Sequence, residues 1–234
     1  MIDREFIRRL SVKWQTSETN VAREYLQHNF LRIFYQQKKS HQIFFKGGTA
    51  LRLVFDSPRF SEDLDFSSLV TSVKTIEDLL GETLLQLSYQ QISLDMTEAK
   101  STSGGYLFYA KTILFDKEIN LKLNFVIKKS AANQTETVKS IFMSPYSLVV
   151  LRTRELISEK VEAFLTRHKV RDYFDLYYVL RANLERNVIL ARRVEIIKVI
   201  NSSKLNLGEL KVFLPRTFLL LLKDLKNSLL RELR

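Results

Sequence analysis

The sequence predicts an α+β protein, in which a small mixed β-sheet with flanking helices is followed by an all-helical C-terminal lobe. Short apolar or alternating runs, which are typical of strands, end near Leu151. From Thr153 onward, apolar residues recur only at helical spacing. Because mixed patterns come first and helical ones follow, we place a domain boundary near residue 150. Residues 1–150 would form an α/β lobe with N-terminal helices, and residues 151–234 a basic helical lobe.

The first elements of the α/β lobe follow from local patterns. A capped helix is expected over residues 17–37, where apolar side chains recur every three or four positions. The apolar run 43–45 stops at two glycines, which indicates a buried strand that enters a turn. Residues 49–55 have a helical pattern that a Ser-Pro step ends. Residues 63–66 alternate between polar and apolar, as a half-buried strand does.

The same patterns predict the remaining elements. Further helices are expected at residues 73–87, 154–168, 171–182, 188–200 and 216–231. Further strands are expected at residues 88–98, 106–115, 119–127 and 147–151, with a hairpin turn at 116–118 and a polar loop at 129–137.

Composition narrows the class of protein. The 234 residues are 45% hydrophobic and 27% charged, which excludes a disordered or fibrous chain. The net charge is +11, and the last 84 residues hold 18 basic and 10 acidic side chains. A basic lobe suits a polyanion such as nucleic acid, although a solvated surface explains the charge equally well. The chain has no Cys, no apolar run of membrane length and no signal-peptide pattern, so we expect a cytoplasmic protein without a membrane partner.

Two glycines separate the expected strand at 43–45 from the helix that follows. Gly47 and Gly48 let the backbone approach a ligand closely, and a helix that starts there would direct N–H groups at a phosphate. A tight strand-to-helix turn is the alternative. The residues that would bind nucleotide around this turn are Lys46, Gly47, Gly48 and Thr49, together with Ser61 from the next motif.

The next strand carries two carboxylates. Residues two apart on a strand face the same side, so Asp63 and Asp65 would lie together. Two like charges at that separation are costly unless a cation lies between them, and Mg²⁺ takes oxygen ligands beside substrate phosphates. Two surface aspartates on a solvated strand are the alternative. A phosphate-binding turn followed by a metal-binding pair is nonetheless what phosphoryl or nucleotidyl transfer requires.

These two motifs, at residues 46–51 and 61–66, resemble the AbiEii/AbiGii toxin family of the DNA polymerase β-like nucleotidyltransferase superfamily. Later motifs of that family match in order: an apolar-Lys-apolar-acid strand at residues 121–124, a helix with a lysine at 159–163, and Arg-Asp-x-x-Asp-Leu at 171–176. The resemblance covers about residues 40 to 180. It implies a nucleotidyltransferase-like fold for the first lobe.

The resemblance also implies roles for single residues. Asp63 and Asp65 would bind Mg²⁺ or Mn²⁺ and be catalytic. Lys160 would contact the triphosphate as a point charge, and Asp175 would orient Lys160 or manage protons. A salt bridge to Arg171 is the structural alternative for Asp175, although Asp172 suits that bridge better. Arg52 and Arg59 are further candidates for phosphate contacts.

Asn124 departs from the family pattern, which has a carboxylate at this position. An amide can coordinate a metal through its oxygen, but it cannot act as a base. Asn124 is therefore a possible third metal ligand, but it cannot deprotonate the attacking hydroxyl. Fewer metals, a base elsewhere such as Asp175, or an inactive member would each fit this change.

The resemblance implies an enzyme that transfers NMP from an NTP to an acceptor and releases pyrophosphate. It further implies a toxin of a type IV-like toxin–antitoxin or phage-defence system, with an antitoxin as partner. Relatives modify the 3′ end of tRNA, so tRNA is the expected RNA acceptor, and the basic lobe is compatible with it. Two alternatives stay open: an enzyme of the same fold that acts on a small molecule, and a catalytically inactive module that binds nucleic acid or a protein partner.

Overall fold

The computed structural model describes residues 2–234, which divide into two compact units. Unit 1 comprises residues 1–56 and 60–151, and unit 2 comprises residues 57–59 and 152–234. A short segment of the chain, Ser57–Arg59, thus belongs to the second unit although the strand that follows it belongs to the first. None of the helices within residues 2–234 is both long and apolar enough to cross a membrane.

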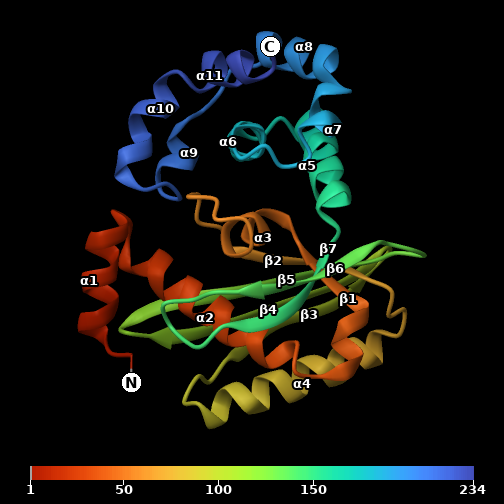
Figure 1. Cartoon of the computed structure of the whole chain (residues 1–234). Coiled ribbons are helices and arrows are strands. Elements are labelled where there is room, and N and C mark those ends of the chain that lie inside the picture. Colours follow the sequence, from red (N-terminus) through yellow and green to blue (C-terminus); the bar gives the residue numbers. More distant parts are fainter. Residues whose placement is uncertain (1) are drawn as a thin grey trace. The chain divides into compact units, whose positions relative to one another are not determined.

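Unit 1 is built around one seven-stranded mixed sheet (Figure 1). The strand order is β3-β4-β5-β2-β1-β7-β6. The pairs β2–β5 and β1–β7 are parallel, and the other four are antiparallel. The strands are β1 (Ile43–Lys46), β2 (Asp63–Ser68), β3 (Asp95–Thr102), β4 (Gly105–Leu114), β5 (Lys117–Ile127), β6 (Asn133–Val138) and β7 (Tyr146–Leu151).

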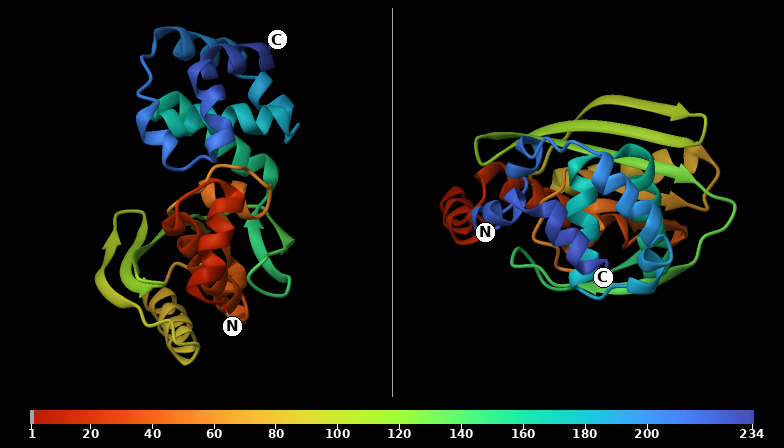
Figure 2. Two further views of the ribbon diagram at one scale, coloured as in Figure 1. Left: turned by 90° about the vertical axis from the view of Figure 1, so that its left-hand side faces the viewer. Right: turned by 90° about the horizontal axis from the view of Figure 1, so that it is seen from above.

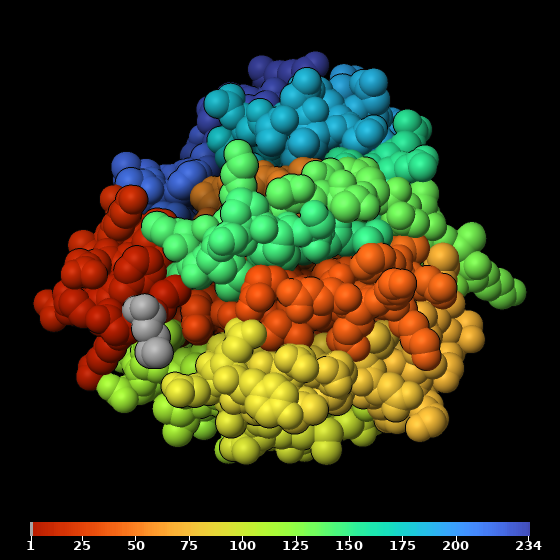
Figure 3. All heavy atoms as spheres, turned by 60° about the horizontal axis from the view of Figure 1, so that its bottom comes forward, coloured from red at the N-terminus to blue at the C-terminus, as the bar shows by residue number. Residues whose placement is uncertain are grey.

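Helices flank the sheet of unit 1, and α3 and α4 lie on opposite sides of it in Figure 1. Figure 3 shows α4, in yellow, spread over the outside of this unit, and Figure 2 (left) shows the β3–β4 hairpin extending beside α4. The helices are α1 (Arg4–Trp14), α2 (Glu18–Phe34), the short 3₁₀ helix η1 (Lys38–Gln42), α3 (Gly47–Leu53) and α4 (Val73–Tyr89).

Unit 2 contains only helices. They are α5 (Thr153–Arg167), α6 (Val170–Arg181), α7 (Arg186–Leu190), α8 (Arg193–Ser202), α9 (Gly208–Lys211), the 3₁₀ helix η2 (Arg216–Phe218), α10 (Leu219–Lys223) and α11 (Leu225–Glu232). The α+β class and the helical C-terminal part are therefore confirmed.

Aromatic packing between α2 and the sheet forms the centre of unit 1. Phe66 of β2 stacks on Phe125 of β5, with ring centroids 4.8 Å apart and an interplanar angle of 11°. Phe34 of α2 lies 5.6 Å from Phe66 on the same face. All three side chains are almost fully buried. Because side chains alternate along β2, this packing directs Asp63 and Asp65 to the opposite face of the sheet.

Five element predictions are wrong. The strand expected at 88–98 begins only at Asp95, because α4 continues to Tyr89. The loop expected at 129–137 contains β6, an edge strand whose mostly polar side chains give no apolar signal. The helices expected at 188–200 and 216–231 are each interrupted, into α7 and α8, and into η2, α10 and α11. The hairpin turn lies at Phe115 and Asp116, both with positive φ, rather than at 116–118.

Replacing Phe66 by Ala should destabilise unit 1 by about 3–5 kcal/mol, because it leaves a cavity beside Phe125 that the sheet cannot close. Urea unfolding followed by the fluorescence of Trp14, the one tryptophan of the chain and a residue of unit 1, measures this loss. Val12→Ala is the control, since Val12 is 74% exposed and should change stability by less than about 0.5 kcal/mol. Equal midpoints for both variants would contradict the packing described above.

Candidate active site

The turn between β1 and α3 packs directly against one of the two carboxylates. Gly47 has φ +86°, in the left-handed region that favours glycine. A Cβ atom on Gly47 would lie 2.4 Å from Oδ2 of Asp65, which is closer than any real contact. Thr49 secures the same region, because its hydroxyl donates a hydrogen bond of 2.5 Å to the backbone carbonyl of Asp63. The two motifs predicted from the sequence therefore meet in space.

The remaining residues of the first motif lie close to this contact. Lys46 ends β1, where it is opposite Asp65 in the antiparallel register, and its side chain is buried. Gly48 is also buried, in the first turn of α3. Ser61 is half-buried, and its carbonyl accepts a hydrogen bond of 3.0 Å from the Gln27 side chain.

The parallel neighbour strand β5 gives each carboxylate a partner. In the register of β2 and β5, Asp63 is opposite Lys122 and Asp65 is opposite Asn124. The Lys122 ammonium lies 3.5 Å from Oδ2 of Asp63. The Asn124 amide nitrogen donates a hydrogen bond of 3.2 Å to Oδ1 of Asp65. Asp63 and Asp65 are both half-buried.

The neighbours of Lys122 favour its protonated, positively charged form. Partial burial alone would lower its pKa, but the Asp63 carboxylate and the polar Tyr109 side chain, through charge and hydrogen bonding, raise the pKa above its ordinary value. The ammonium lies 5.5 Å from the centroid of the Tyr109 ring, within the range of a cation–π contact. Lys122 therefore supplies a positive charge beside Asp63.

Helix α2 fixes the segment that leads into β2. The Gln27 side chain donates hydrogen bonds to the carbonyls of Ser61 and Glu62, at 3.0 and 3.1 Å. The Arg23 guanidinium lies 3.3 Å from the Glu62 carboxylate. Burial lowers the pKa of Arg23, and the attraction of Glu62 and Asp63 opposes that shift. A second cation thus lies near Asp63, and nothing in the local sequence pattern signalled it.

Unit 2 contains the other two predicted residues, which form an ion pair with each other. Lys160 of α5 lies 2.8 Å from Oδ2 of Asp175 of α6. Arg59 binds the same carboxylate with two hydrogen bonds, of 2.7 and 3.0 Å. The side chain of Asp175 is 1% exposed, and that of Lys160 is 11% exposed. One buried carboxylate therefore holds two cations in place.

This environment decides what Asp175 can do. Burial alone would raise its pKa, but the charges and hydrogen bonds of Arg59 and Lys160 outweigh burial and hold the pKa well below its usual range. A carboxylate with so low a pKa is a weak base. The geometry therefore favours a positioning role for Asp175 toward Lys160 over a role in proton transfer.

Two arginines expected to contact phosphates have carboxylate partners in this structure. Arg59 binds Asp175, as described above, and Arg52 binds Glu24 at 2.8 Å. The bridge suggested between Asp172 and Arg171 is wrong, because Asp172 pairs with Arg167 at 2.9 Å.

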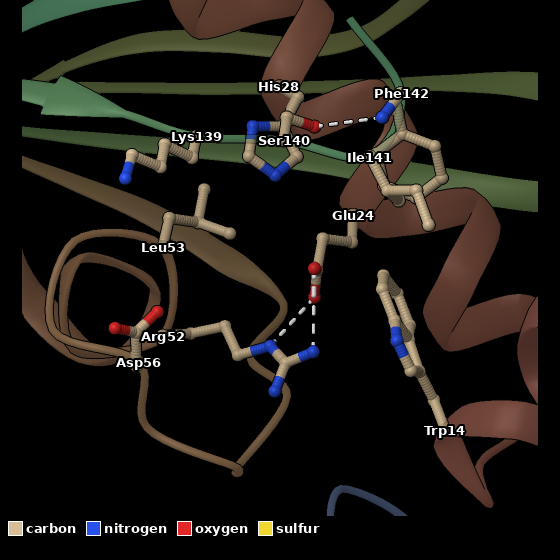
Figure 4. Close-up of a pocket in the computed structure, with 10 residues that line it drawn as sticks. All are labelled: Trp14, Glu24, His28, Arg52, Leu53, Asp56, Lys139, Ser140, Ile141 and Phe142. Atoms are coloured by element: carbon tan, nitrogen blue, oxygen red, sulfur yellow. Dashed lines mark hydrogen bonds and ion pairs between the residues drawn. The ribbon is translucent and has the colours of Figure 1, made fainter. Parts of the chain in front are cut away.

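Unit 1 also contains a pocket of about 210 Å³ at the C-terminal end of α3 (Figure 4). The Arg52–Glu24 ion pair lies across it, and Trp14 and Phe142 line its walls. His28 also lines it, and burial together with the charge of Arg52 lowers the pKa of His28 to about 4. Arg52, a candidate for phosphate contacts, lines this pocket, whereas the turn at residues 46–49 and the carboxylates of Asp63 and Asp65 do not.

Asp63 and Asp65 fit a divalent metal by their chemistry. Both present carboxylate oxygens, which Mg²⁺ prefers, on the same face of one strand. Within residues 2–234, no group of three or more His, Cys, Asp or Glu side chains gathers as a metal site.

The fold and this site define a nucleotidyltransferase. Residues 29–232 match the family described as "Nucleotidyl transferase AbiEii toxin, Type IV TA system", and the chain belongs to that family. The resemblance found from the motifs is thereby confirmed. A sequence comparison with curated proteins found no significant match.

Solved structures show the same fold. MenT4, a nucleotidyltransferase toxin from Mycobacterium tuberculosis, is similar with a TM-score of 0.72 and 15% sequence identity, over 100% of this chain and 90% of that chain. JHP933 from Helicobacter pylori is similar with a TM-score of 0.63 and 19% identity, over 93% of this chain and 91% of that chain. At these identities, the structures support the fold and not the details of the site.

Gly47→Ala should reduce transfer at least tenfold, because the added methyl group would displace the Asp65 carboxylate and strain the turn. Incorporation of radiolabelled NMP measures the effect. Gly81→Ala in α4 is the matched control, since a Cβ there meets nothing within 4 Å. If both variants retain full activity, the contact between Gly47 and Asp65 is not important for the site.

Asp175→Asn should destabilise the chain by about 3–5 kcal/mol, because Arg59 and Lys160 then remain buried without a counter-charge. Urea unfolding at pH 7, followed by circular dichroism, measures this loss. The pKa of Asp175 is lower in the folded than in the unfolded chain, so its contribution is complete above about pH 4 and is lost as the pH falls further. In the variant, the free energy of unfolding should no longer fall with pH below about pH 4 because of this group. The same pH dependence in both proteins would contradict the ion-pair description.

Proposed function

We propose that this toxin transfers NMP from an Mg²⁺-bound NTP to an RNA acceptor, the 3′ end of tRNA, and releases pyrophosphate. The observation that carries the proposal is the contact of the Gly47 turn with Asp65, on a strand that also presents Asp63. This arrangement brings a backbone turn suited to phosphates next to two metal-binding carboxylates. The family supplies the reaction class, and the residues supply the metal and nucleotide sites.

The reaction forms one bond and breaks one. The acceptor hydroxyl oxygen bonds to the α-phosphorus, and the bond from that phosphorus to the oxygen bridging to the β-phosphate breaks. A divalent ion held by Asp63 and Asp65 would neutralise phosphate charge during this step. The Gly47–Gly48 backbone and Thr49 would position the phosphates, together with Lys46 and Ser61. The hydroxyl proton passes to solvent, because Asn124 has no basic group and the pKa of Asp175 is held low.

Lys160 and Asp175 act as a pair in this proposal. Lys160 supplies a positive charge for the triphosphate, and Asp175 with Arg59 fixes the direction of its side chain. We assign Asp175 to positioning for this reason.

RNA as the acceptor is supported by charge. The last 84 residues carry 18 basic and 10 acidic side chains, and a small-molecule acceptor would need no such excess. Since NTP and tRNA both occur in the cytoplasm, we place the protein there. The type IV family description supports an antitoxin partner, and we propose that this system serves in phage defence.

Asp65→Ala should abolish transfer while the fold stays intact, because it removes a metal ligand and no core volume. Total cellular RNA is incubated with Mg²⁺ and each α-³²P-labelled NTP in turn, and label in a tRNA-sized band is measured. Asp95→Ala, which removes an exposed strand carboxylate, is the matched control and should keep full activity. Unchanged labelling by Asp65→Ala would refute the site. Absence of label with the intact protein would favour a small-molecule acceptor or an inactive binding module.

Lys160→Ala should raise the KM for NTP more than tenfold and leave the Kd for tRNA within about twofold, because the lost charge faces nucleotide in this proposal. Steady-state kinetics and filter binding measure the two constants. Lys198→Ala, an exposed lysine of α8, is the matched control. A larger effect on tRNA binding than on nucleotide use would remove Lys160 from the nucleotide site.

A further inference from the structure

We propose that the Asp63–Asp65 pair holds one divalent cation in the working enzyme rather than two. This inference rests on the proposed function and specifies its metal requirement. Two-metal transferases need enough carboxylate charge to keep two dications about 3.5–4 Å apart. The residues around this pair do not supply that charge.

The residue opposite Asp65 is the first reason. Asn124 is uncharged, and its amide nitrogen donates to Oδ1 of Asp65 at 3.2 Å. One oxygen of Asp65 is therefore held by a neutral donor. A carboxylate in the place of Asn124 would add a negative charge and two oxygen ligands at this point. Asn124 occupies the position of the third carboxylate that would bridge to a second ion, and its amide brings no negative charge there.

The residue opposite Asp63 is the second reason. The Lys122 ammonium lies 3.5 Å from Oδ2 of Asp63, so the pair already has a fixed positive charge on its β5 side. The carboxylates of Asp63 and Asp65 and the ammonium of Lys122 together carry a net charge of −1. That charge suits one dication together with the negative phosphates of an NTP, and a second dication would have to displace or repel Lys122.

No other acidic side chain of unit 1 replaces the missing ligand. The nearest one along the chain, Glu62, faces Arg23 at 3.3 Å. Within residues 2–234, no third His, Cys, Asp or Glu joins Asp63 and Asp65 in a metal-binding group. Asn124 is thus uncompensated, and the site supports one ion.

Mn²⁺ is a suitable probe because its electron paramagnetic resonance spectrum counts bound ions and detects coupling between two of them. The full chain is titrated with Mn²⁺ in the presence of a non-hydrolysable NTP analogue. We expect one Mn²⁺ per chain with an uncoupled spectrum. Asn124→Asp should bind two ions with a coupled spectrum, because it restores the third carboxylate.

Asn120→Asp is the matched control. Asn120 lies on the same strand and the same face, four residues from Asn124, and is opposite Lys111 rather than Asp65. This variant should bind one ion like the parent chain, which separates a ligand effect from a general gain of negative charge.

Two coupled ions in the unaltered chain would overturn the one-ion inference, and so would a single ion in Asn124→Asp. Transfer of labelled NMP is measured on the same preparations. Active protein with two ions refutes only the one-ion inference. Protein that binds no ion and transfers no label refutes the proposed function as well.

Discussion

Two carboxylates on one face of one strand repel each other, and the structure of unit 1 compensates this repulsion from several directions. Lys122 and Asn124 approach from β5, Arg23 reaches the neighbouring Glu62 from α2, and the Thr49 hydroxyl fixes the backbone of Asp63. Gly47 suits this position because its φ is positive and a Cβ there would collide with the Asp65 carboxylate. The aromatic core on the other face of β2 fixes which way the pair points.

A second charged cluster organises unit 2. The carboxylate of Asp175 pairs with both Arg59 and Lys160. Because Arg59 lies just before the strand that carries the aspartates, the sequence region between the first two motifs contributes a residue to the helical unit. Asp175 of the last predicted motif thus forms an ion pair with Lys160, and its lowered pKa makes it a weak base.

Much of this site could be predicted from sequence because its parts are local. Asp-x-Asp on a strand and Gly-Gly after a strand each specify a geometry over a few residues, and motif order relates them. The partners of Arg52 and Arg59 could not be predicted, since ion pairs with Glu24 and Asp175 span 28 and 116 positions of the chain. The polar edge strand β6 was missed because an edge strand needs no apolar face. Lys122 could have been identified, since it lies two residues before Asn124 and so shares its face.

The central claim is that Asp63 and Asp65 together bind the metal at which the nucleotide reacts. Crystals grown with Mn²⁺ and a non-hydrolysable NTP analogue test it directly, because the anomalous signal of manganese locates the ion. The account predicts an anomalous peak in contact with both carboxylates, with the α-phosphate of the analogue beside it and the Gly47 turn against the phosphates. A peak away from this pair, with nucleotide bound elsewhere, would contradict the account.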